Sequence, residues 1–131
     1  MTIVLINPNL LVQKNDPFTT GIVYMPIGLA YTAASLRAAN IKLKVVDAFA
    51  EKPFQTRIEG KFLLLGLHYE EVVKEISGQE VKAIFVYAIN LINHLSTVGL
   101  VKAIKKALPH IPLIVLENPH AVTAYSLPFV K

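Results

Sequence analysis

Residues 3–8 read IVLINP, an apolar run of four residues that ends abruptly in a polar residue and a proline. The run does not alternate with polar residues, which is typical of a strand covered on both faces, as in a parallel sheet. Similar runs recur at Leu43–Val46, Ala83–Tyr87 and Ile111–Leu116. The sequence therefore predicts four buried strands.

A first helical pattern follows the first strand. Residues 26–39 begin with Pro26, which suits a first helical turn because its missing N–H needs no partner there, and Asn40 ends the pattern. Small residues form the expected inward face of this helix: Gly28, Ala30, Ala33, Ala34 and Ala38. We expect them to let the helix backbone lie close to the sheet or to a flat ligand.

Two further helices are predicted between the later strands. Residues 69–77 carry apolar residues at helical spacing, and Gly78 ends the pattern. The third helix is expected to take Ser96 or Thr97 as its N-cap and to end before Pro109. Its expected buried residues are Val101, Ile104 and Leu108. Strands that alternate with helices in this way predict a right-handed βαβ arrangement in one α/β domain, residues 1–131.

Two stretches do not fit a minimal βα unit. Residues 7–25 are too long and too polar for an ordinary connection, and we expect a loop there. Residues 48–68 contain Pro53, Gly60 and the run LLLG, which favours a hairpin or an extra turn beside the main sheet. Long loops at strand ends are where binding residues usually lie.

Composition excludes several classes of function. Because the chain contains no cysteine, it has no disulfide, no cysteine nucleophile and no cysteine-bound iron–sulfur cluster of its own. The net charge of +4 is dispersed, apart from three lysines near residue 105, which argues against nucleic-acid binding. No apolar run approaches the roughly 20 residues of a membrane span. The opening MTIVLINPN has no basic leader, so we expect a cytoplasmic protein.

No complete catalytic motif is present. The chain lacks GxGxxG, the P-loop and GxSxG, so neither a nucleotide cradle nor a serine nucleophile is recognisable. The histidines at positions 68, 94, 110 and 120 are separated and form no metal-binding motif. Asp47 and Glu117 follow different strands, and capping is the favoured role for both. We therefore predict no catalytic residue and no metal ligand in this chain.

Four segments in order nevertheless resemble a known family. They are IVLINP at 3–8, PIGLAYTAASL at 26–36, VVDA at 45–48, and IPLIVLENPHAVTAY at 111–125. Together they resemble the N-terminal cobalamin (B12)-binding domain of B12-dependent radical SAM enzymes, which carries NPP, P-x-G-L-x-Y-L-A-x-x-L, D-A and G-G-P-H-A-T at these places. The resemblance covers nearly the whole chain.

The resemblance implies a Rossmann-like, flavodoxin-like fold of three layers with strand order 2-1-3-4, and cobalamin over the carboxyl ends of the strands. It implies cofactor contacts at the four strand ends. The candidates are Asn7, Pro8, Asp47, Ala88, Ile89, Asn90, Glu117, Asn118, Pro119, His120 and Ala121. The implied role is a cobalamin-binding module of a radical SAM methyltransferase-like enzyme, with the catalytic domain or subunit elsewhere.

The chain departs from the family pattern in ways that matter. Glu117 and Asn118 stand where two glycines are usual, and NPN replaces NPP. There is no DxHxxG, so we predict that no histidine of this chain is the lower axial ligand of cobalt. CxxxCxxC is absent, so the chain alone holds no radical-forming cluster.

Two alternatives remain open from the sequence. One is a degenerate module that binds no cofactor and serves subunit association; an end before a fifth strand would leave the edge at residues 111–116 open to a second copy or a partner. The other is an unrelated flavodoxin-like receiver or flavin domain. A receiver needs acidic residues after the first strand, and residues 7–15 contain none.

Overall fold

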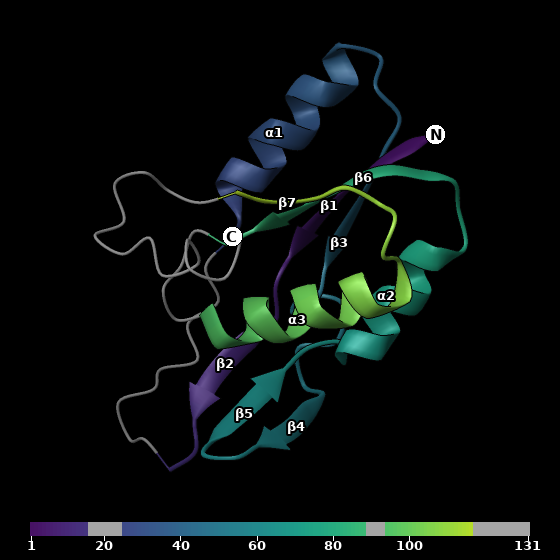
Figure 1. Ribbon diagram of the computed structural model, residues 1–131. Helices are drawn as coiled ribbons and strands as arrows, with labels where there is room; N and C mark the ends of the chain where they lie inside the picture. The colour runs from purple at the N-terminus through teal and green to yellow at the C-terminus, as the bar shows by residue number, and fades with distance from the viewer. Residues whose placement is uncertain (16–24, 89–93, 117–131) are drawn as a thin grey trace.

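The computed structural model describes residues 1–15, 25–88 and 94–116. Its main sheet contains four parallel strands, β1 (Thr2–Asn7), β3 (Leu43–Asp47), β6 (Val81–Tyr87) and β7 (Leu113–Leu116), in the order β3-β1-β6-β7. Counted along the main sheet alone, this is the predicted order 2-1-3-4 (Figure 1). The predicted α/β fold with a parallel sheet is confirmed.

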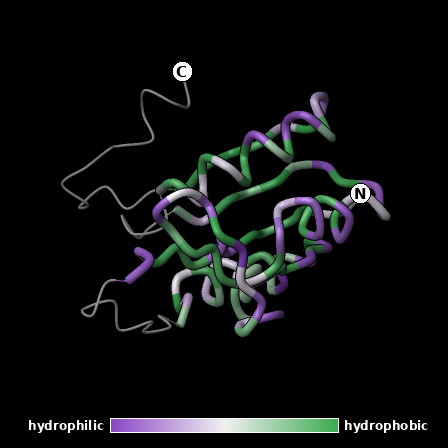
Figure 2. Tube along the Cα trace, turned by 90° about the horizontal axis from the view of Figure 1, so that it is seen from below, coloured by the Kyte–Doolittle hydropathy of each residue, from purple (hydrophilic) through white to green (hydrophobic). Residues whose placement is uncertain are grey.

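Residues 3–6 of β1 are all apolar because both faces of this strand are covered. Val4 and Ile6 are fully buried among residues of α2 (Tyr69–Ser77) and α3 (His94–Ala107). Leu5 points to the other face, where it is buried against α1 (Ile27–Ala38). Figure 1 shows α1 on one side of the main sheet and the other two helices on the opposite side, which gives three layers. Figure 2 shows apolar segments gathered in the interior of the molecule.

The bounds of α2 are those predicted, and α1 ends within a residue of its predicted C-terminus. The N-cap expected for α3 is wrong. The helix begins at His94, so Ser96 and Thr97 lie inside it, and both are buried. The Ser96 hydroxyl donates to the backbone oxygen of Asn9, 2.8 Å away, in place of capping its own helix.

The expected inward face of α1 is only partly correct. Leu29 and Ala33 are buried against the sheet, whereas Ala30, Ala34 and Ala38 are exposed. A single straight helix meets a sheet along one narrow stripe, so residues beside the stripe face outward. Ala30 and Ala34 therefore line the flank of this helix, whereas Ala33 forms part of its contact with the sheet.

A second, smaller sheet lies beside the carboxyl ends of the main strands. It consists of β2 (Leu10–Gln13), β5 (Phe62–Leu65) and β4 (Thr56–Glu59), antiparallel in the order β2-β5-β4. The predicted hairpin within residues 48–68 is confirmed, and Gly60 occupies its turn with a φ of 61°. The strand β2 is a correction, because residues 7–25 were expected to be loop.

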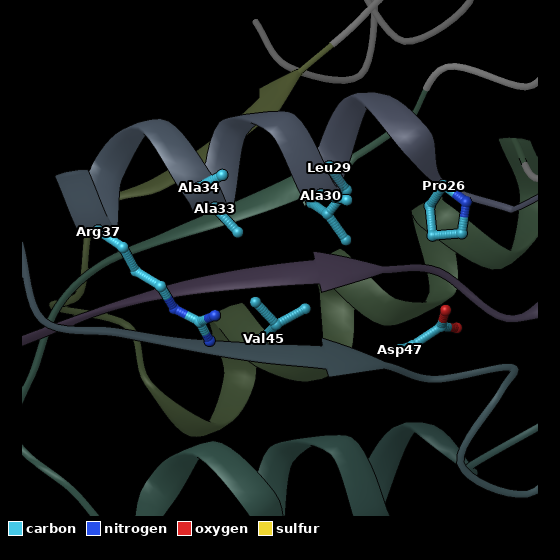
Figure 3. Close-up of a pocket in the computed structure, with 8 residues that line it drawn as sticks. All are labelled: Pro26, Leu29, Ala30, Ala33, Ala34, Arg37, Val45 and Asp47. Carbon is cyan, nitrogen blue, oxygen red and sulfur yellow. The ribbon is translucent and has the colours of Figure 1, made fainter.

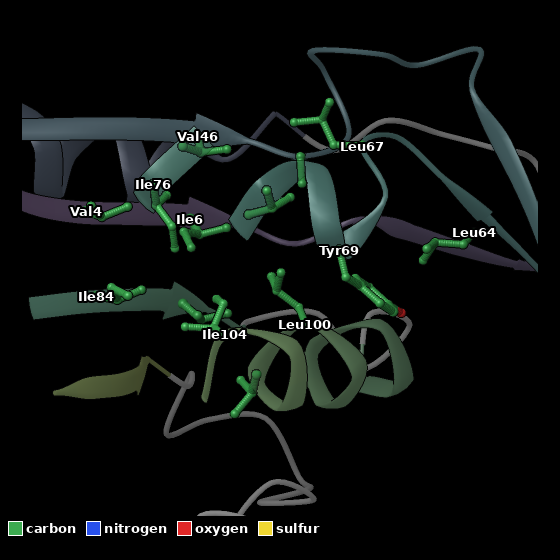
Figure 4. Packing of buried hydrophobic residues seen from close by; sticks show 14 of the residues in the cluster. Val4, Ile6, Val46, Leu64, Leu67, Tyr69, Ile76, Ile84, Leu100 and Ile104 are labelled. Carbon is green, nitrogen blue, oxygen red and sulfur yellow. The ribbon is translucent and has the colours of Figure 1, made fainter. Parts of the chain in front are cut away.

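One continuous core joins the two sheets. Figure 4 shows buried residues from β1, β3 and β6 meeting those of α2 and α3. Leu11 and Leu64 of the small sheet belong to the same cluster. Val101 and Ile104 are buried as predicted, and Leu108, just past the end of α3, packs against the cluster while partly exposed. The small sheet is thus an integral part of the domain.

Candidate functional site

The carboxyl edge of the main sheet carries the sequence-predicted residues that the structure describes. Asn7 and Asp47 end adjacent strands and are register partners. Pro8 is buried directly after β1, and Ala88 follows β6, where its N–H bonds to the oxygen of Leu116 at 2.8 Å. The remaining candidates, Ile89, Asn90 and residues 117–121, lie outside the described residues.

The Asn7 and Asp47 side chains form a hydrogen bond across this edge. Nδ2 of Asn7 donates to Oδ1 of Asp47 over 3.0 Å, and the N–H of Ala50 donates to the same oxygen over 3.0 Å. The carboxylate therefore fixes the orientation of the Asn7 amide and also caps the turn that follows β3. An oriented amide at a strand end can donate to and accept from a polar ligand.

Asn9 is a buried polar residue that the sequence reasoning did not single out. Its Nδ2 donates to the oxygens of Leu65 and Leu67, and its own backbone oxygen accepts from Ser96. Asn9 is fully buried and joins the end of β1 to the small sheet and to α3. Its Oδ1 and the hydroxyl of Thr97 are buried without a partner in the described part of the chain. The only signal for it in the sequence is a polar residue between two apolar runs.

The N-terminal end of α1 packs tightly on the last residue of β6. A β-carbon added to Gly28 would overlap the Tyr87 hydroxyl and lie 2.9 Å from its Cζ atom. The glycine thus lets the helix rest on the tyrosine ring beside the carboxyl edge. This contact sets the height of α1 above the sheet at the end where the candidate residues gather.

A shallow groove of about 280 Å³ runs between α1 and β3 (Figure 3). Asp47 stands at one end of it beside Pro26, Arg37 lies toward the other end, and Val45 lies between them. Leu29, Ala30, Ala33 and Ala34 line the helix side. The exposed small residues of α1 thus form one wall of an apolar groove that has a charged group at each end.

Glu71, in the first turn of α2, has a perturbed pKa and belongs to a structural network at the start of that helix. The Glu71 carboxylate accepts from Lys52 at 2.5 Å, from the backbone N–H of His68 at 2.8 Å and from Gln55 at 2.5 Å. These bonds lower the pKa of Glu71 to about 2. The His68 side chain in return accepts the backbone N–H of Glu71, which completes a capping box. This network stabilises the helix end.

Tyr69, the first residue of α2, is also perturbed. Its pKa is raised, first by burial and then by the nearby Glu59 carboxylate, 3.4 Å from the hydroxyl. The ring packs against Gly99 of α3, where an added β-carbon would lie 2.6 Å from it. The residue therefore serves the contact between the two helices.

Metal ligands do not gather anywhere in residues 1–15, 25–88 and 94–116. In these ranges, no group of three His, Asp or Glu side chains is placed to hold a metal ion. No helix among them is both long and apolar enough to cross a membrane.

No protein-family model matches this chain, and no curated protein or solved structure is significantly similar to it.

Proposed function

We propose that this chain is a cobalamin-binding module that serves a radical SAM methyltransferase-like enzyme in the cytoplasm. The radical-forming domain or subunit lies outside this sequence, which has no cysteine. The bound cofactor supplies a cobalt centre able to carry a methyl group. The chain's own residues bind and orient the cofactor and take no covalent part in the reaction.

The gathering of Asn7, Pro8, Asp47 and Ala88 at one edge of the sheet carries the proposal. In open α/β sheets, ligands bind outside the carboxyl ends of the strands, at the point where the connections turn to opposite sides. Here α1 follows β1 on one face and α3 follows β6 on the other. The strands β1 and β6 are neighbours, so Asn7 and Ala88 flank this point.

The chemistry of these residues suits the proposed ligand. The rim of a corrin ring carries amide side chains, which need both donors and acceptors. The Asn7 amide retains its Oδ1 and one N–H after its bond to Asp47.

The groove beside α1 is too small for the cofactor. At about 280 Å³, it lies below the lower limit of roughly 300 Å³ for small-molecule sites. We therefore assign the cofactor to the strand edge and not to this groove.

A binding assay tests the proposal directly. Purified protein is incubated with hydroxocobalamin and desalted, and its visible spectrum is recorded. We expect a stoichiometric corrinoid band to remain with the protein. A colourless protein that is folded by circular dichroism would overturn the assignment.

A second candidate function is a module that binds no cofactor and serves only subunit association. The observation that favours it is the edge of β3, on whose outer side the described residues place no further strand. The same samples separate the two candidates. A colourless protein that sediments as a dimer supports the association module, whereas a coloured protein supports the cofactor module in either oligomeric state.

A further inference from the structure

Among the described residues, no strand pairs with the outer edge of β3. Within the described ranges this strand pairs with β1 alone. The N–H of Ile3 bonds to the oxygen of Lys42, and the N–H of Ala48 bonds to the oxygen of Asn7, so the even-numbered residues of this segment face β1. Successive residues of a strand direct their N–H and C=O groups to opposite sides. Leu43 and Val45 therefore point theirs away from the sheet.

The side chains along this edge have a distinct charge pattern. Arg37, in the last turn of α1, hangs over β3 toward its amino end, and Asp47 stands at the carboxyl end (Figure 3). Val45 lies between the two and is 37% exposed. Arg37 has no ion-pair partner among the described residues. On the face toward α1, the edge thus carries a positive end, an apolar centre and a negative end. Lys44, next to Val45 on the strand, points to the other face and forms an ion pair with Glu75 of α2.

We propose that a second copy of the chain pairs with this edge, so that two β3 strands run antiparallel about a two-fold axis at Val45. Such pairing places each valine opposite the other and Leu43 opposite Asp47 of the second copy. The outward backbone groups of the two Val45 residues then meet, as an antiparallel ladder requires. The Asp47 oxygen already accepts the N–H of Glu51 over 3.1 Å, and its second lone pair is available to the N–H of Leu43 in the other copy. The carboxyl end of each strand arrives at the amino end of the other. Each Asp47 therefore reaches Arg37 of the other copy, and the ion pair forms twice.

The helices above this edge are compatible with the same arrangement. Strands in a sheet lie about 4.8 Å apart, so two α1 helices, each above the gap between β1 and β3, would be on the order of 10 Å apart. Packed helices have similar separations when the contact residues are small. Ala30 and Ala34 are exposed on the flank that faces the second copy. The groove of each copy would then be closed by the other.

The opposite edge, β7, was expected from the sequence to mediate self-association. Its residues Leu113–Leu116 include no charge, so nothing on the strand selects an orientation. Pro112 directly precedes it and lacks a backbone donor. The charge pattern on β3 makes that edge the better self-complementary surface.

Sedimentation velocity without cobalamin tests the dimer by charge exchange. Arg37→Glu turns both ion pairs into repulsive pairs and should raise the dimer dissociation constant by on the order of 100-fold. Asp47→Arg should have the same effect. In a mixed dimer of the two variants, the introduced glutamate of one chain faces the introduced arginine of the other, and the unchanged Arg37 and Asp47 also face each other. An equimolar mixture should therefore recover dimers that neither variant forms alone.

A control variant and a substitute variant complete the test. Lys102→Glu makes the same charge change at an exposed position of α3 and should leave the dimer intact. If Asp47→Arg fails to fold, Val45→Lys replaces it, because two lysines at the two-fold axis should also give monomers. A monomeric wild-type protein at high concentration, or an Arg37→Glu protein that still dimerises, overturns the proposal. Arg37→Glu should keep its corrinoid band, so failure of the dimer is distinguishable from failure of the cofactor assignment.

Discussion

The Tyr87 hydroxyl occupies the space that a β-carbon on Gly28 would fill. Gly28→Ala must therefore push α1 away from β6 or displace the tyrosine ring. We expect a loss of about 1–3 kcal/mol in the free energy of unfolding, the usual cost of overpacking, measured by urea denaturation. Gly78→Ala is the matched control, because its added methyl meets open space at a φ of −80°. Equal stability of Gly28→Ala and the wild type would contradict this packing.

The Asn7 amide is expected to contact the cofactor. Asn7→Ala removes it but leaves Asp47 bonded to the N–H of Ala50, so the turn after β3 should persist. We expect hydroxocobalamin affinity to fall on the order of tenfold, equivalent to about 1.4 kcal/mol, by spectral titration. Ser35→Ala, an exposed change near the far end of α1, should bind normally. Unchanged affinity in Asn7→Ala would remove this residue from the site.

Asn9 holds three segments together from a fully buried position. Asn9→Ala deletes its donor to the oxygens of Leu65 and Leu67 and leaves both carbonyls without that partner. We expect the free energy of unfolding to fall by about 1–3 kcal/mol. Gln13→Ala, an exposed change at the end of β2, should fall within about 0.5 kcal/mol of the wild type. A silent Asn9→Ala would show that the small sheet is held by apolar contacts alone.

The Glu71 network should make stability depend on acid pH. The pKa of Glu71 lies below its ordinary value of 4.5, at about 2, so the folded state favours the carboxylate. Its contribution is complete above pH 4.5 and is lost as the pH falls toward 2. The side chain is 34% exposed, so solvent screening keeps the effect modest. The midpoint of urea unfolding is measured from neutral pH down to the pKa of Glu71. It should decline less steeply with falling pH in Glu71→Gln than in the wild type. Parallel curves for the two proteins would refute the network's role.

The sequence predicts those parts of the fold that rest on local pattern. The four main strands follow from short continuous apolar runs and α2 from helical spacing, and the order of the strands is confirmed. Strand β2 was missed because the strand with which it pairs, β5, lies far along the chain. The start of α3 was missed because the bond from Ser96 to Asn9 is a tertiary contact.

The candidate site was predictable in part for the same reason. Residues at the carboxyl ends of adjacent parallel strands, such as Asn7 and Asp47, necessarily lie side by side at one edge of the sheet. The role of Asn9 depends on where the small sheet lies, which the local sequence does not reveal. The exposure of Ala30 and Ala34 depends on how far α1 leans over β3, and this is set by packing on Tyr87. Tertiary packing therefore determines what the pattern leaves open.

The junction between β1 and β2 consists of Pro8 and Asn9 alone. Its shortness bears on the order of events during folding. The hairpin of β4 and β5 turns at Gly60 and Lys61, so it can close within microseconds from neighbouring residues. Strand β2 must instead find partners about fifty positions later in the chain, a slow search of high contact order. We expect the hairpin to be an early kinetic unit and the addition of β2 to be the step that locks the two sheets into one cooperative body.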